Sequence, residues 1–108
     1  MIRIPFPQAP DYPDVEPGFD GPKVAAIHGL MGHDLMRKHL LRMMRETGYR
    51  DATIYSHLHP TKAIADDLCE AVGANRRIAI VGYSQGGFEA IKVARELARR
   101  DITVDLVV

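Results

Sequence analysis

Short apolar runs alternate with longer amphipathic stretches along most of this chain. The apolar runs occupy residues 23–28, 52–55, 77–82 and 103–108. Between them lie stretches that repeat apolar side chains at the spacing of a helix, over residues 34–47, 61–72 and 85–100. Strands that alternate with helices in this way form a parallel sheet with helices on its faces. The sequence therefore predicts an α/β fold of three layers, with a mainly parallel sheet between the helices.

The helical spacing also predicts which side chains face the sheet. In the last amphipathic stretch the positions predicted to face inward are Phe88, Ile91, Ala94, Leu97 and Ala98. In the middle stretch, a run of acidic side chains is most simply a solvated face, and it comprises Asp66, Asp67 and Glu70.

The first 22 residues differ from the rest of the chain. They hold all but one of the seven prolines. Each proline fixes its own φ and biases the preceding residue toward extended geometry. We predict an extended, proline-rich arm over residues 1–22, with a short edge strand at residues 2–6, and one α/β unit over residues 23–108.

Composition excludes several classes of partner. The 14 basic and 14 acidic side chains balance, so no basic stripe favours nucleic acid. No apolar run approaches the length of a membrane span, and the N-terminus lacks the apolar segment of a secretory signal. Cys69 is the single cysteine, so no internal disulfide can form. We expect a cytoplasmic protein with no membrane span, no nucleic-acid partner and no cofactor.

A serine stands between glycines at the end of the third apolar run, in the stretch GYSQGG. Gly82, Ser84 and Gly86 fit the pattern G-x-S-x-G. A serine at a tight turn from strand to helix adopts strained backbone angles, and side chains two residues before and after it would crowd the turn. The turn presents the serine hydroxyl at the start of the following helix, whose dipole favours developing negative charge. The N–H of Gln85 would then point at a substrate oxyanion.

A second motif follows the first apolar run, where His28 and Gly29 lead into the stretch HGLMGHD. Together, HG after one strand and GYSQGG after the strand two further on resemble the α/β-hydrolase superfamily, in its lipase, esterase and thioesterase branch. The resemblance covers residues 23–108. It implies a partial α/β-hydrolase fold in which these two strands lie side by side.

The resemblance also implies roles for individual residues. Ser84 would be the catalytic nucleophile, and the backbone N–H groups of Leu30 and Gln85 would form the oxyanion hole. Met31 replaces Leu30 if the loop is shifted by one residue. His28 and Gly29 would shape the oxyanion loop, and the substrate would be a small-molecule carboxylic ester or thioester.

The serine lacks its usual partners in this sequence. In the family the chain order is serine, then an acid, then a histidine that acts as the base. No histidine follows Ser84, because all five precede it: His28, His33, His39, His57 and His59. The last two form an H-x-H pair, but no third metal ligand is evident, so we expect no metal site. We interpret residues 23–108 as the N-terminal half of a hydrolase domain, truncated after the strand that follows the nucleophile helix, with the catalytic acid and histidine expected beyond Val108.

Two other functions stay open. The missing histidine favours a degenerate, non-catalytic module that binds a ligand or a partner and self-associates through the last strand, residues 103–108. A flavodoxin-like nucleotide-binding domain, with GYSQGG holding phosphate, is a third interpretation. The absence of a P-loop lysine and of a G-x-G-x-x-G pattern after any strand argues against it.

Overall fold

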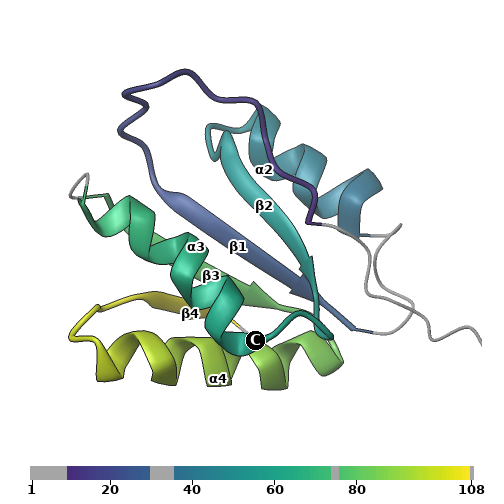
Figure 1. The fold of residues 1–108 in the computed structure, drawn as a ribbon. Coiled ribbons are helices and arrows are strands. Elements are labelled where there is room, and N and C mark those ends of the chain that lie inside the picture. Colours follow the sequence, from purple (N-terminus) through teal and green to yellow (C-terminus); the bar gives the residue numbers. More distant parts are fainter. Residues whose placement is uncertain (1–9, 30–35, 74–75, 108) are drawn as a thin grey trace, which may run out of the picture.

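The computed structural model describes residues 10–29, 36–73 and 76–107. Four strands form one sheet in which every neighbouring pair is parallel, in the order β2–β1–β3–β4 (Figure 1). Their bounds are β1 (Lys23–His28), β2 (Asp51–Ser56), β3 (Ile78–Gly82) and β4 (Asp105–Val107). The α/β fold with a parallel sheet is confirmed, although β4 is shorter than the predicted final strand.

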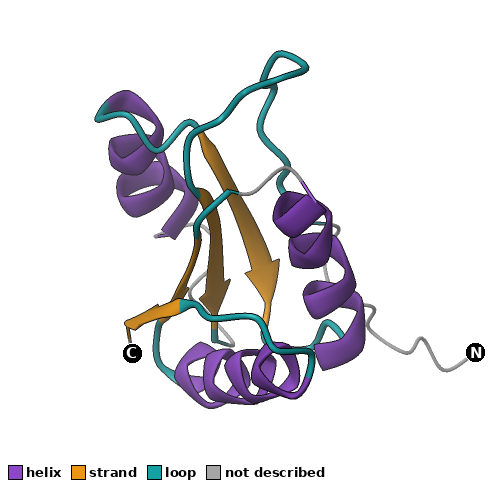
Figure 2. Cartoon of the chain, turned by 90° about the vertical axis from the view of Figure 1, so that its left-hand side faces the viewer, coloured by secondary structure: helices purple, strands orange, loops and turns teal. Residues whose placement is uncertain are grey.

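Helices cover both faces of the sheet (Figure 2). On one face, the π-helical turn η1 (Met36–Leu41) continues directly into α2 (Arg42–Glu46). On the other face lie α3 (Thr61–Gly73) and α4 (Gln85–Arg99), which contact each other. The predicted three layers are therefore present. Within the described ranges, no helix has the length and apolar character that crossing a bilayer requires.

The sheet separates two apolar clusters. The cluster under α3 and α4 includes Ile27, Leu68, Ile80 and Leu97, and all four side chains are fully buried. The smaller cluster under η1 and α2 includes Val24, Leu41 and Ile54. Because β1 contributes to both clusters, its sequence is apolar at successive positions rather than at alternate ones.

The rotation of α4 about its axis differs from the prediction. Phe88, predicted to face the sheet, is 73% exposed, and Ala98 is exposed as well. The buried positions of this helix are Gly86, Glu89, Ala90, Val93 and Leu97, of which only Leu97 was predicted. Gly86 packs directly against the backbone of β1, and this contact sets the rotation of the whole helix. The prediction for Phe88 is therefore wrong.

The described part of the N-terminal arm, residues 10–22, lies against β2. Asp11 and Ile54 exchange two backbone hydrogen bonds, with N···O distances of 3.0 and 3.2 Å. The hydroxyl groups of Tyr12 and Tyr55 both donate to Asp67 Oδ2, at 2.7 and 3.0 Å. The arm is thus tied to α3 through Asp67, which corrects the interpretation of that residue as part of a solvated face. The edge strand predicted at residues 2–6 lies outside the described residues.

Asp66 has a partner too, because it accepts a hydrogen bond from Arg100 Nη1 at 2.9 Å. The same guanidinium nitrogen lies 3.2 Å from Cys69 Sγ. The acidic run on α3 therefore connects this helix to the arm on one side and to the end of α4 on the other.

Candidate functional site

The carboxyl ends of β1 and β3 meet at the point where the chain changes direction along the sheet. The chain leaves β1 toward β2 on one side, and it leaves β3 toward β4 on the other. Open parallel sheets bind ligands at such switch points. Here the Tyr83 N–H donates to Ile27 O at 2.9 Å, which holds the segment after β3 against the end of β1.

Ser84 lies between β3 and α4 with backbone angles that are rare for a serine. Its φ is 57° and its ψ is −126°. Such a conformation costs a residue with a side chain about 1–3 kcal/mol, so the surrounding structure must enforce it. The side chain is exposed, and its hydroxyl makes no capping hydrogen bond to α4. The turn therefore presents the hydroxyl to solvent at the residue that directly precedes α4.

The two flanking glycines are required by close packing. A Cβ atom on Gly86 would lie 2.0 Å from Ile27 O, and one on Gly82 would lie 2.6 Å from Gly87 Cα. Both distances are far below van der Waals contact, and both neighbours are backbone atoms that cannot move aside easily. Glycine at these positions therefore lets α4 begin directly against β1 and β3.

Gly29 brings the loop after β1 against the serine turn. A Cβ atom on Gly29 would lie 3.2 Å from Ser84 Cβ and 2.9 Å from the backbone nitrogen of Gln85. The loop that continues from Gly29 thus starts beside the Gln85 backbone nitrogen. Leu30, the predicted second oxyanion donor, and its alternative Met31 lie outside the described residues.

His28 is buried at the base of this loop. Its Nδ1 atom lies 2.6 Å from Gly29 O, so this nitrogen carries a proton and donates it. Its carbonyl oxygen accepts from the His57 N–H at 2.9 Å, which joins the ends of β1 and β2. His28 therefore contacts the loop that the sequence assigned it to.

The other predicted histidines are placed differently. His39 is exposed on η1, and His33 lies outside the described residues. His59 Nδ1 accepts from the Ser56 N–H at 3.1 Å, whereas His57 Nδ1 is buried and has no hydrogen-bond partner within residues 10–29, 36–73 and 76–107. Among the residues that the structure describes, no group of three histidine, cysteine or carboxylate side chains could hold a metal ion.

The sequence shows Glu89 as an acid that follows Ser84, but sequence reasoning missed that this carboxylate is buried, one turn into α4. Its Oε1 atom accepts a hydrogen bond from the Thr61 hydroxyl at 2.5 Å. This bond ties the start of α3 to the helix that follows Ser84. A signal was present, since Glu89 stands four and eight residues before the buried Val93 and Leu97 and therefore shares their face of the helix.

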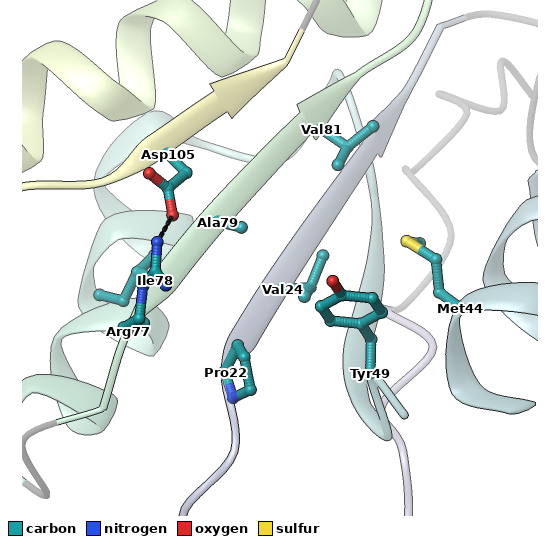
Figure 3. Close-up of a pocket in the computed structure, with 9 residues that line it drawn as sticks. All are labelled: Pro22, Val24, Met44, Tyr49, Arg77, Ile78, Ala79, Val81 and Asp105. Atoms are coloured by element: carbon teal, nitrogen blue, oxygen red, sulfur yellow. Dashed lines mark hydrogen bonds and ion pairs between the residues drawn. The ribbon is translucent and has the colours of Figure 1, made fainter. Parts of the chain in front are cut away.

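A cavity of about 340 Å³ lies on the opposite face of the sheet from α4 (Figure 3). Val24, Ala79 and Val81 form its floor, and the ion pair between Arg77 and Asp105, at 2.8 Å, lies at one side. The remaining lining residues are Pro22, Met44, Tyr49 and Ile78. Most of this lining belongs to the amino ends of the strands, so the cavity is not part of the serine turn.

Comparison of the chain with protein-family models, curated proteins and solved structures finds no match. The local geometry around Ser84 is therefore the basis for a functional proposal.

Proposed function

We propose that this chain carries the nucleophile of a serine hydrolase that acts on carboxylic esters or thioesters. The observation that supports this most strongly is the backbone of Ser84. A positive φ at a non-glycine residue, enforced by backbone packing at Gly82 and Gly86, presents an exposed hydroxyl at the carboxyl edge of a parallel sheet. A turn with only a structural role would be relieved of this strain by a glycine.

In the proposed reaction Ser84 Oγ attacks the carbonyl carbon of the substrate. The carbonyl oxygen becomes an oxyanion, which the N–H groups of Gln85 and Leu30 stabilise together with the N-terminal end of α4. The C–O or C–S bond to the leaving group then breaks, the alcohol or thiol departs, and water hydrolyses the acyl-serine. The Oγ proton must pass to a base, and the proposal assigns that role to no residue of this chain.

A fluorophosphonate probe tests the nucleophile directly, because Oγ forms a bond to phosphorus as the P–F bond breaks. The 108-residue chain is treated with the probe alone and with added imidazole, which accepts the Oγ proton in place of a histidine. We expect little labelling of Ser84 without imidazole and a clear increase with it, read by mass spectrometry of the modified peptide. Ser84→Ala should show no labelling in that peptide.

The same reaction in urea supplies the control for folding. If Ser84 reacts no faster in the folded chain with imidazole than in the unfolded chain, the turn does not activate or present the hydroxyl, and the proposal is wrong.

A second candidate is a non-catalytic module that self-associates through β4. One edge of β4 has no strand partner in the described sheet, and Leu106 and Val107 are 41% and 59% exposed. Unpaired edge strands with apolar side chains readily pair with another chain. A stable dimer in sedimentation experiments, combined with no labelling of Ser84 under any condition, would favour this candidate, and a monomer would exclude it.

A further inference from the structure

A groove between the start of α3 and the outer face of α4 is lined mostly by cationic side chains. Its volume is about 390 Å³. The lining residues are Thr61, Lys62, Lys92, Arg95, Glu96 and Arg99. Four of these six carry a positive charge and one carries a negative charge, although the chain as a whole has no net charge.

The carboxylates near the groove already have partners. Glu96 accepts from Arg99 at 2.9 Å and forms a second ion pair, at 3.3 Å, with Arg100, which lies outside the groove. Two further acids lie nearby: Glu89 accepts the Thr61 hydroxyl and lies 3.9 Å from Lys92 Nζ, and Asp66, one turn after Lys62, pairs with Arg100 at 2.9 Å. Even with Glu89 and Asp66 counted, the four cations that line the groove outnumber the three carboxylates.

Two of the cations have no ion pair in the parts of the chain that the structure describes. Lys62 is exposed in the first turn of α3, and Arg95 is exposed in the middle of α4. Neither forms a salt bridge there. The groove therefore has uncompensated positive charge at both of its walls.

The arrangement of the cations indicates the kind of anion that fits. Lys92, Arg95 and Arg99 follow one another at spacings of three and four residues, so they form a single row along α4 that spans about 10 Å. Lys92 and Arg99 have side chains that are 65% and 73% exposed. A compact anion such as phosphate is held by donors that converge on it. A row of separate, exposed cations instead matches a row of carboxylates.

We propose that this groove is a docking surface for an acidic helix of a partner protein. Carboxylates at spacings of three and four residues on such a helix would face Lys92, Arg95 and Arg99, with Lys62 contacting them from α3. Opposite charges of this kind raise the association rate and the selectivity of a complex. The proposal rests only on the charges and geometry of the groove, so it does not depend on the chemistry of Ser84.

The groove lies apart from the serine turn. Lys92 follows Ser84 by eight residues, which is about 12 Å along the axis of α4. The cationic row runs from Lys92 toward Arg99, away from Ser84. A partner docked on this row therefore contacts the part of α4 that lies toward its carboxyl end.

The probe for this surface is a synthetic helical peptide with glutamates at spacings of three, four and seven residues, labelled with a fluorophore. Its binding to the full chain is measured by fluorescence anisotropy at low salt. We expect the double substitution Lys92→Glu and Arg95→Glu to weaken binding at least about tenfold, because it replaces two attractive charges with repulsive ones. The matched control is Lys38→Glu with Arg42→Glu, two exposed cations four residues apart on the other face of the sheet.

A gain of affinity supplies a second readout that a misfolded variant could not produce. Glu96→Gln removes the single carboxylate that lines the groove, and we expect it to tighten peptide binding about two- to threefold. Equal weakening by the groove variant and the control, or no change with Glu96→Gln, would overturn the proposal. Displacement of the peptide by inorganic phosphate at a concentration where chloride has no effect would also overturn it, because the site would then hold a compact anion.

Discussion

Ser84 is one of two non-glycine residues with a positive φ in the described part of the chain, the other being Asp101. Its hydroxyl is exposed, and its backbone has a φ of 57° with a ψ of −126°. Strain of this kind persists only where the surroundings enforce it. Here the enforcing contacts are the backbone hydrogen bond from Tyr83 to Ile27 and the packing of Gly86 on Ile27 O. The strain is thus located in the turn itself and not in the sheet.

Two substitutions of Ser84 separate the effect of backbone strain on stability from the effect of losing the hydroxyl. Ser84→Gly removes the Cβ atom and should stabilise the folded chain by about 1 kcal/mol, after the entropy cost of a new glycine is subtracted. Ser84→Ala keeps the Cβ atom and should leave stability within about 0.5 kcal/mol of the wild type. Urea unfolding of the three proteins measures both values. A glycine variant that is no more stable than the alanine variant would mean that the turn is not strained.

At the residue level the sequence predicted the serine turn because the requirement is local. Gly82 and Gly86 stand two residues from Ser84, and the reason for each lies within the turn or in the strand beside it. The role of Asp67 could not be predicted in this way. Its partner Tyr12 lies 55 residues away in the sequence, and only the folded arm brings the two together.

The secondary-structure elements themselves were largely predictable, and the rotation of α4 was not. The bounds of β1 and α3 follow from apolar periodicity and from the residues at their ends. In α4, Phe88 and Ala90 both fit an apolar face, and periodicity alone does not choose between them. The choice is made by Gly86, because contact with Ile27 O turns the side of the helix that carries Ala90 toward the sheet and Phe88 away from it.

Two substitutions test this rotation. Phe88→Ser should change the free energy of unfolding by less than about 0.5 kcal/mol, because the side chain is already largely exposed. Leu97→Ala removes a fully buried side chain from the same helix and should cost about 2–5 kcal/mol. Urea unfolding gives both values. A large loss on Phe88→Ser would instead support the inward position that the periodicity predicted.

An ion-pair network lies at the amino end of the strands, opposite the end that carries Ser84. Asp51, which begins β2, accepts from Lys23 Nζ at 3.0 Å and from Arg76 Nη2 at 2.5 Å. Burial by itself would raise the pKa of Asp51, but the hydrogen bonds from Arg76 and Lys23 outweigh it and hold that pKa below its ordinary value. The folded state therefore binds fewer protons here than the unfolded state does. This contribution to stability is present above about pH 4 and is lost as the pH falls further.

The substitution Asp51→Asn should remove this contribution to stability and so allow it to be measured. The variant leaves Lys23 and Arg76 largely buried without their anion, at a cost of about 3 kcal/mol at pH 7. The difference from the wild type should shrink as the pH falls below about 4, because protonated Asp51 no longer pairs with either cation. Urea unfolding between pH 3 and pH 7 measures it. A difference that stays constant over this range would show that the carboxylate charge of Asp51 does not contribute.

At the scale of the whole molecule, the two edge strands of the sheet, β2 and β4, differ in how they are covered. The edge at β2 is shielded by the N-terminal arm through its bridge between Asp11 and Ile54, and every residue of β2 is buried. At the other edge, all three residues of β4 are exposed. In the part of the chain that the structure describes, no element pairs with the outer side of β4. The described sheet therefore has one protected edge and one edge that no described element covers.

The uncovered edge of β4 leads to a prediction about how copies of the chain associate. If copies of the chain pair through β4, a lysine on this strand should block pairing, because a charge at a sheet edge opposes the addition of another strand. Val107→Lys should then raise the dissociation constant of the dimer at least about tenfold, as measured by sedimentation at several concentrations. Leu58→Lys is the matched control, since Leu58 is 55% exposed and follows β2 at the opposite edge. If both lysines weaken association equally, added charge alone explains the effect and β4 is not the contact. If only Val107→Lys weakens association, the contact lies at β4, the edge that the arm does not cover.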